Sequence, residues 1–170
     1  QDGLLEINDN VATNLYGTTN SGLESLVQGE EVLRLNGSVF DKNGELWIAN
    51  SRINNGLKRF NPETAQTFNV DLTPVISNVI RDLGFSDVVL DRDGNVFMGT
   101  YRNGIVGYNV DNGRLIKLFG EAEGSNLPND FVKALEVDRN NQLWIGTTQG
   151  LRVLFNAPGV FQQSNPQVSP

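Results

Sequence analysis

The sequence predicts an all-β fold that is built from a repeated unit of antiparallel strands. One stretch occurs three times: DKNGELWIANSRINNG at 41–56, DRDGNVFMGTYRNG at 91–104 and DRNNQLWIGTTQG at 138–150. In each copy an aromatic residue follows the first Asp by six positions, and the three pairs are Asp41 and Trp47, Asp91 and Phe97, and Asp138 and Trp144. The chain also has 18 glycines in 170 residues, as expected when many tight turns join short strands.

The repeat length identifies the architecture. A four-stranded repeat of about 40 to 50 residues is typical of the blades of a β-propeller. One blade cannot bury its own two faces, so the aromatic residue of each second strand is expected to be a buried wedge between neighbouring blades. Stacking of these aromatic residues on sugars is the alternative. The chain length predicts a β-propeller fragment of about three and a half four-stranded antiparallel blades.

The predicted units follow the chain in order. Residues 1–31 form a partial blade and a connection, with strands at 3–7 and 11–16. Residues 32–71 form a blade, with strands at 33–41, 45–50, 57–60 and 65–70. Each third strand follows a glycine, and residues 3–7 match this pattern, so they resemble the third strand of a unit. We therefore expect the sequence to be a segment of a larger protein.

The second half repeats this pattern. Residues 72–119 are a connection, with one short helix in 75–83, and a blade with strands at 86–91, 95–100, 105–109 and 114–119. Residues 120–163 are a polar connection at 120–131 and a blade with strands at 132–138, 142–147, 151–155 and 160–162. Residues 164–170 contain two prolines and no periodicity, and are predicted to be a linker or tail.

Composition excludes several functions. Thirteen basic and twenty acidic residues give a net charge of −7, which argues against nucleic-acid binding. The chain has no Cys and no His, so disulfides, thiolate metal sites and histidine catalysis are excluded. No apolar run approaches the roughly 20 residues of a membrane helix, so direct membrane insertion is not expected. We predict no cofactor, no metal site and no catalytic residue.

A family resemblance is carried by residues 126–154, NLPNDFVKALEVDRNNQLWIGTTQGLRVL. This stretch resembles the two-component regulator propeller repeat, whose pattern is a Leu-Pro turn, Val-x-x-aliphatic, Asp-x-x-Gly, Leu-Trp-Ile-Gly-Thr and a Gly-Leu strand. Asn141 replaces the turn glycine, the first copy has Ala49-Asn50 for Gly-Thr, and the second has Phe97-Met98 for Trp-Ile. The resemblance covers most of residues 35–155.

The resemblance implies an extracytoplasmic protein, in the periplasm or at the cell surface of a Gram-negative bacterium. In this family such propellers form the glycan-responsive sensor regions of hybrid histidine kinases, and they also occur in surface proteins. Residues 150–170 are similar to PorZ-like propeller proteins of type IX secretion. That similarity implies a surface-attachment role with an anionic lipopolysaccharide and protein partners.

The candidate ligand site lies in the loops after the second strands. The residue five positions after each aromatic residue is a strong hydrogen-bond donor, and these residues are Arg52, Arg102 and Gln149. Three polar or aromatic residues flank them: Asn54, Tyr101 and Asn103. Such a rim would suit carboxylates, phosphates or acidic sugars. The alternative is that these residues are solvated loop tips.

The other motif residues are predicted to be structural. The Asp-x-x-Gly turns resemble a calcium loop but lack its remaining ligands, so Asp41, Asp91 and Asp138 are predicted to be turn residues. The glycines that open the third strands are Gly56, Gly104 and Gly150. Propeller lyases or lactonases are the enzymatic alternative, for which Asp87 is the inner-strand acid to check. We predict a non-catalytic role in binding or scaffolding. The ring is completed either by the rest of a larger propeller or by a second copy of the chain, which would give a homodimer with about seven blades.

Overall fold

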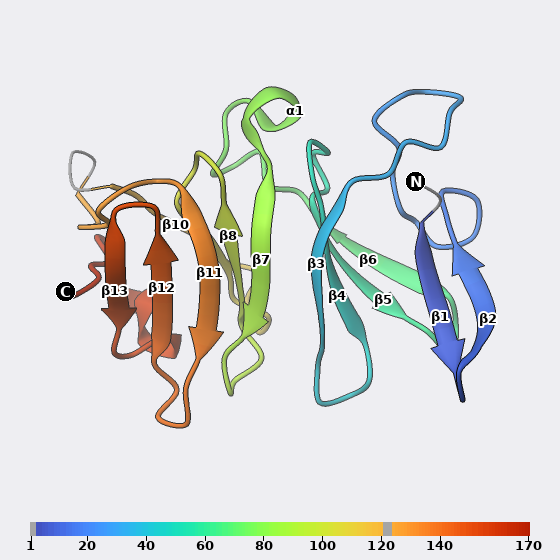
Figure 1. Ribbon diagram of the computed structural model, residues 1–170. Helices are drawn as coiled ribbons and strands as arrows, with labels where there is room; N and C mark the ends of the chain where they lie inside the picture. The colour runs from blue at the N-terminus through green and yellow to red at the C-terminus, as the bar shows by residue number, and fades with distance from the viewer. Residues whose placement is uncertain (1–2, 121–123) are drawn as a thin grey trace.

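The computed structural model describes residues 3–120 and 124–170, and in this part of the chain four antiparallel sheets follow one another (Figure 1). Residues 1–2 of the predicted partial blade and residues 121–123 of the predicted connection lie outside the described residues. The three larger sheets stand side by side with their first strands, β3 (Leu35–Phe40), β7 (Phe85–Leu90) and β11 (Val132–Val137), adjacent, as blades do in a propeller. The predicted all-β class is confirmed.

The first two sheets are a hairpin and a complete four-stranded sheet. Strands β1 (Leu4–Asn8) and β2 (Val11–Tyr16) form the N-terminal hairpin. Blade 1 has the order β3-β4-β5-β6 and comprises β3 (Leu35–Phe40), β4 (Leu46–Asn50), β5 (Leu57–Asn61) and β6 (Gln66–Val70).

The next two sheets repeat this arrangement. A short helix, α1 (Val79–Asp82), precedes blade 2, which comprises β7 (Phe85–Leu90), β8 (Val96–Thr100), β9 (Ile105–Tyr108) and β10 (Leu115–Leu118). Blade 3 has three strands: β11 (Val132–Val137), β12 (Leu143–Thr147) and β13 (Gly150–Leu154). The short helix predicted within 75–83 is therefore confirmed.

The strand predicted at 160–162 is wrong, because Pro158–Gln162 form a 3₁₀-helix. Pro158 lies in the first turn of this helix, where its missing N–H costs nothing. The Gly159 amide donates to Asn156 Oδ1 at 3.1 Å and stabilises the turn. The helix buries Phe161, whose ring lies 5.6 Å from that of Phe97 in blade 2.

The last residues also differ from the prediction of a linker or tail. Ser169 and Val153 exchange two backbone hydrogen bonds of 2.8 Å, so the chain end pairs with β13. The adjacent Val168 is buried in the core between blades 2 and 3. The tail thus occupies the place of a fourth strand, because an unpaired edge and an apolar side chain are both satisfied there.

The three repeated turns have the same hydrogen bonds. One oxygen of each Asp accepts from the backbone amides two and four residues later, as Asp41 Oδ1 does from Asn43 and Glu45 at 2.8 and 3.1 Å. The fourth turn residue has a left-handed φ of 80° at Gly44 and 61° at Asn141. Asn tolerates this conformation better than most residues, so the missing glycine is explained and the turn prediction is confirmed.

The wedge prediction holds for two blades of three. Trp47 is 1% exposed between blades 1 and 2, and Phe97 is fully buried between blades 2 and 3. Trp144 is 38% exposed, so its predicted burial is wrong. In the described part of the chain no further sheet covers the face of blade 3 on which Trp144 lies.

The inner strands β3, β7 and β11 lie next to one another (Figure 1). Asp87 of β7 joins this strand to β11. The Oδ2 atom of Asp87 accepts from the Leu135 amide of β11 at 2.9 Å, and Oδ1 accepts from the Val88 amide. Oδ2 therefore joins blade 2 to blade 3, whereas Oδ1 is bonded within β7. Asp87, the inner-strand acid to check for catalysis, has a structural role here.

Candidate ligand-binding site

Two cavities open between blade 1 and blade 2, at opposite ends of their strands. One, of about 390 Å³, lies beside the Asp turns at the end of β3 and β7, and we call it the turn-side cavity. The other, of about 490 Å³, lies where these strands begin, and we call it the loop-side cavity. The loops that carry the predicted ligand residues reach only the second.

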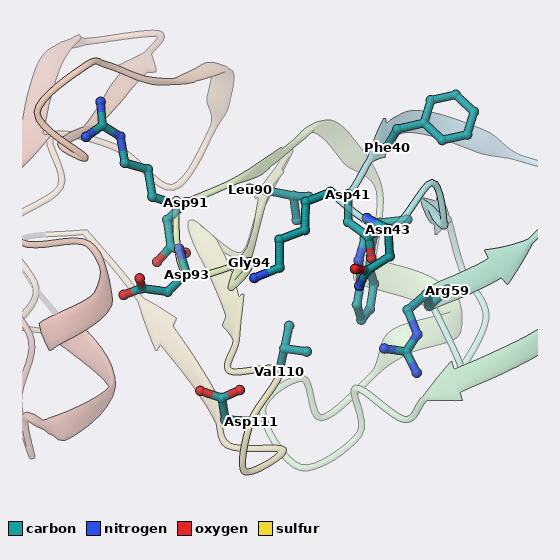
Figure 2. Close-up of a pocket in the computed structure, with 13 residues that line it drawn as sticks. Phe40, Asp41, Asn43, Arg59, Leu90, Asp91, Asp93, Gly94, Val110 and Asp111 are labelled. Atoms are coloured by element: carbon teal, nitrogen blue, oxygen red, sulfur yellow. The ribbon is translucent and has the colours of Figure 1, made fainter.

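Figure 2 shows the turn-side cavity, with Asp91 and Asp93 on the blade 2 side and Arg59 on the blade 1 side. Four charged side chains of this cavity have partners within the protein: Asp41, Arg59, Asp91 and Arg92. Among the described residues, three others have no side-chain hydrogen bond or ion pair: Lys42, Asp93 and Asp111. Arg59 pairs with Glu45 at 3.3 Å, and its guanidinium lies 5.6 Å from the Trp47 ring. Asp91 accepts three local hydrogen bonds, and burial raises its pKa while the bonds from Asn95 partly oppose that shift. The unpartnered charges of this cavity are therefore of both signs, one cation and two acids.

The loop-side cavity differs because it contains two unpartnered guanidiniums. Its walls come from the segment before and into β3, from the β4–β5 loop and from blade 2: Val32, Leu33, Arg34, Leu35, Asn36, Ser51, Arg52, Gly84 and Tyr101. Arg34 and Arg52 are both exposed. Within residues 3–120 and 124–170, neither guanidinium has a hydrogen bond or an ion pair to another side chain or carbonyl.

The backbone of the β4–β5 loop fixes the position of Arg52. Arg52 has a left-handed φ of 61°, and its amide donates to the Leu83 carbonyl at 2.9 Å. The same link recurs one blade later, where the Gly104 amide donates to Asp130 O at 3.0 Å. Each loop is thus attached to the connection that enters the next blade. The Arg52 side chain extends from a fixed base.

Tyr101 forms an aromatic wall of the loop-side cavity. Its ring lies against Gly84, where a Cβ atom would come within 2.9 Å of Tyr101 Cδ2. On the other side the ring centroid is 5.1 Å from that of Phe131, and Lys133 Nζ lies 4.7 Å from the Phe131 ring. The small residue at Gly84 therefore makes room for a ring that stays partly exposed.

Ser51 and Asn36 form a fixed polar part of the same cavity. Ser51 Oγ donates to Asn36 Oδ1 at 2.6 Å and accepts from the Phe85 amide at 3.1 Å. Asn36 Nδ2 has no hydrogen-bond partner among the described residues. A few polar groups held in place within a cavity can orient a polar ligand.

The structure brings together only some of the predicted ligand residues. Arg52 and Tyr101 line the loop-side cavity. Four others do not: Asn54, Arg102, Asn103 and Gln149. Asn103 has structural partners, since its Nδ2 donates to Asp82 O and its Oδ1 accepts from Lys117 Nζ, both at 3.1 Å.

Sequence reasoning missed Arg34 and Asn36. Both residues lie at the start of the inner strand β3. The connection that enters a blade and the loop between the second and third strands lie on the same side of the propeller, as Arg34 and Arg52 do here. A search for basic residues in those connections would have found Arg34.

Two further structural features bear on function. No three His, Cys, Asp or Glu side chains gather as a metal site in the described ranges. Among the same residues, no helix is both long and apolar enough to span a membrane.

The amino-acid sequence is similar to those of known propeller proteins. The family model described as two component regulator propeller matches residues 126–149, which confirms the resemblance predicted from the sequence. Over 110 residues, or 64% of the chain, the sequence is 31% identical to histidine kinase P4 of Formosa agariphila. The chain spans 8% of that kinase.

Solved structures share the fold. PorZ, a bacterial surface component of the type IX secretion system of Porphyromonas gingivalis, superposes with a TM-score of 0.81 at 20% identity, over 98% of this chain and 24% of its own. The extracellular domain of a putative hybrid two component system from B. thetaiotaomicron has a TM-score of 0.60 at 20% identity, over 77% of this chain and 17% of its own. A Staphylococcus aureus virginiamycin B lyase gives 0.53 at 16% identity, over 70% and 36%. The β-propeller fold is thereby confirmed.

Proposed function

We propose that this chain is a non-catalytic, extracytoplasmic binding segment of a larger propeller protein, and that its loop-side cavity binds an acidic glycan. The observation that carries the proposal is the pair of unpartnered guanidiniums of Arg34 and Arg52 beside the Tyr101 ring. The turn-side cavity between the same two blades has unpartnered charges of both signs, with Lys42 beside Asp93 and Asp111. The charged side chains of the loop-side cavity are both cations, so this cavity suits an anion better.

The chemistry of these groups fits a carboxylated or phosphorylated sugar. A guanidinium offers two parallel N–H donors to a carboxylate or phosphate, which gives both energy and orientation. An aromatic ring beside it packs on the apolar face of a sugar ring. Two local cations attract an anion despite the net charge of −7, because distant surface charges are screened beyond about 8–10 Å at physiological salt.

Two settings are proposed for the parent protein. The 31% identity to a histidine kinase favours a periplasmic sensor region. The likeness to PorZ, with a TM-score of 0.81 over 98% of the chain, favours a surface component of type IX secretion. In that setting the anionic ligand we propose is a lipopolysaccharide. Deletion of the parent gene discriminates between them: loss of a transcriptional response to a glycan supports the sensor, and loss of cargo at the cell surface supports the secretion component.

The binding proposal is tested by calorimetric titration with oligogalacturonate, an acidic sugar probe, and with maltooligosaccharide as the neutral probe. We expect binding of the acidic probe only. Arg34→Ala and Arg52→Ala are each expected to weaken it about tenfold or more, since each removes a charge-assisted contact. Arg81→Ala, on the exposed helix α1, is the matched control. Arg102→Ala is expected to have a smaller effect. Unchanged affinity in both Arg34→Ala and Arg52→Ala would refute the proposal.

A further inference from the structure

The side of the blades that carries the loop-side cavity continues from blade 2 onto blade 3. Three backbone hydrogen bonds define equivalent positions in the blades: the amides of Ser51, Tyr101 and Thr148 donate to the carbonyls of Arg34, Gly84 and Phe131 at 2.8, 2.9 and 3.2 Å. The starts of β7 and β11 lie beside each other at the upper end of the blades in Figure 1. The junction between blades 2 and 3 therefore repeats the backbone arrangement of the junction between blades 1 and 2.

Residue size makes these two junctions different. At the first junction the facing residues are Ser51 and Gly84, and these small residues leave the loop-side cavity open. At the second junction the equivalent residues are Tyr101 and Phe131, whose ring centroids are 5.1 Å apart. The second junction is therefore filled by aromatic rings. Tyr101 belongs to both junctions, because it lines the cavity and also contacts Phe131.

Two cations lie at the second junction. The Lys133 ammonium is 4.7 Å from the Phe131 ring, and this cation–π contact favours its position there. Arg102 directly follows Tyr101 and is the blade 2 equivalent of Arg52. Both cations are exposed, and among the described residues neither side chain has a hydrogen bond or an ion pair. Cations therefore flank the Tyr101 ring at both junctions.

The neighbouring acid does not pair with these cations. Asp130 precedes Phe131, and its Oδ1 atom accepts from the Gly120 amide at 2.7 Å. Its carbonyl accepts from the Gly104 amide at 3.0 Å. Asp130 forms no ion pair with any described residue. The backbone thus holds this carboxylate, and the two cations stay available to an anion.

We propose that Arg102 and Lys133 form a second anion subsite next to the loop-side cavity, and that the ligand is a linear glycan with acidic groups on more than one sugar. This inference rests on the proposed function, in which Arg34 and Arg52 hold one acidic group. A sugar ring of the same chain packs on Tyr101, which is 40% exposed. A further acidic group then reaches the second subsite, so that the two subsites act together on one chain.

Calorimetric titration with digalacturonate and hexagalacturonate tests the second subsite by ligand length. The hexamer is expected to bind more tightly than the dimer. In the variant Arg102→Gln/Lys133→Gln the hexamer should bind about tenfold more weakly, since each exposed cation contributes about threefold, whereas the affinity for the dimer should stay the same. Lys42→Gln/Arg139→Gln is the matched control, because it removes two exposed cations from the turn side. It should leave both affinities unchanged.

Two single substitutions test how the second subsite is built. Phe131 is a positioning residue, since its ring contacts both Tyr101 and Lys133. Phe131→Leu keeps an apolar side chain but removes the ring, so the affinity for the hexamer should fall about threefold and that for the dimer should not change. Lys133→Arg keeps the cation and should retain the affinity for the hexamer. Circular dichroism and urea denaturation check that all variants fold.

The second subsite and the proposed function fail in different ways. If neither probe binds the unchanged chain, or if Arg52→Ala leaves both affinities unchanged, the proposed function fails and the second subsite fails with it. If Arg52→Ala weakens binding of both probes but Arg102→Gln/Lys133→Gln binds the hexamer normally, only the second subsite is refuted. Equal weakening of dimer and hexamer by that double variant also refutes it. So does equal weakening of the hexamer by the turn-side control, because net charge alone would then explain the loss.

Discussion

Two tryptophans at the same repeat position have opposite environments. Trp47 is 1% exposed, and its ring centroid lies 5.9 Å from that of Tyr108 in the next blade. Trp144 is 38% exposed, and its Nε1 donates to Asp138 Oδ2 at 3.0 Å. The local sequences, ELWIAN and QLWIGT, are nearly the same. Burial is therefore set by the neighbouring blade and not by the repeat itself.

The largest expected effect is on stability. Trp47→Ala removes a buried aromatic side chain and is expected to lower the free energy of unfolding by about 3–5 kcal/mol. Trp144→Ala removes a half-exposed ring and one hydrogen bond, and is expected to cost about 1 kcal/mol. Urea denaturation measures both. Trp47→Phe, the residue type that blade 2 has at this position, is the control and should retain most of the stability. Equal losses for the two alanine variants would show that the exposed face of blade 3 is covered in solution.

The next effect concerns the other face of blade 1, which is covered by the loop that precedes β3. Lys58 is fully buried there, and its Nζ donates to Glu24 Oε1 at 2.7 Å and to Asn69 Oδ1 at 2.9 Å. Glu24→Ala leaves a buried cation without its anion, so we expect a loss of about 3 kcal/mol in the free energy of unfolding. Glu136→Ala, at an exposed position of β11 in blade 3, is the control and should change the free energy of unfolding little.

The pH dependence of the Glu24→Ala variant sharpens this result. Burial lowers the pKa of Lys58, and the hydrogen bond that Lys58 donates to Glu24 opposes that shift. A lysine with a lowered pKa in the folded state destabilises the fold while it is charged, and this penalty is lost as pH rises toward its ordinary value of 10.5. The stability difference between Glu24→Ala and the unchanged chain should therefore shrink at alkaline pH. A constant difference would indicate that Glu24 acts through packing of the loop alone.

The comparison also shows how far the sequence predicts this molecule. The strands of the repeats and their Asp turns follow from local patterns that recur at 41, 91 and 138. Burial of the aromatic residue does not follow from the pattern, because Trp144 has no neighbouring blade against it among the described residues. The pairing of Ser169 with β13 could not be predicted, because one bridge has no alternating pattern. Arg34 was missed for a related reason. It has no counterpart in the other repeats, where Gly84 and Phe131 occupy its position, and only the packing of two blades places it beside Arg52.

The smallest expected effect separates two equivalent aspartates. Burial raises the pKa of Asp91, whereas the hydrogen bond from Trp144 Nε1 lowers the pKa of Asp138. NMR titration should find the pKa of Asp91 above the ordinary 3.8 and that of Asp138 below it. A lowered pKa contributes stability above the unfolded-state value, and this contribution is lost as pH falls through the folded-state value.

Substitution of the two aspartates tests the sign of these shifts. Asp138→Asn should reduce stability at neutral pH, with the difference from the unchanged chain disappearing in acid. For Asp91 the sign is opposite: ionisation of the buried carboxyl opposes folding as pH rises through its raised pKa, which offsets part of the loss from Asp91→Asn at neutral pH. Trp144→Phe removes the donor to Asp138 and should return the pKa of Asp138 toward 3.8 while leaving that of Asp91 unchanged. If the pKa of Asp138 stays low in Trp144→Phe, the backbone amides of the turn alone lower it. The exposed Trp144 would then have no part in the electrostatics of the turn.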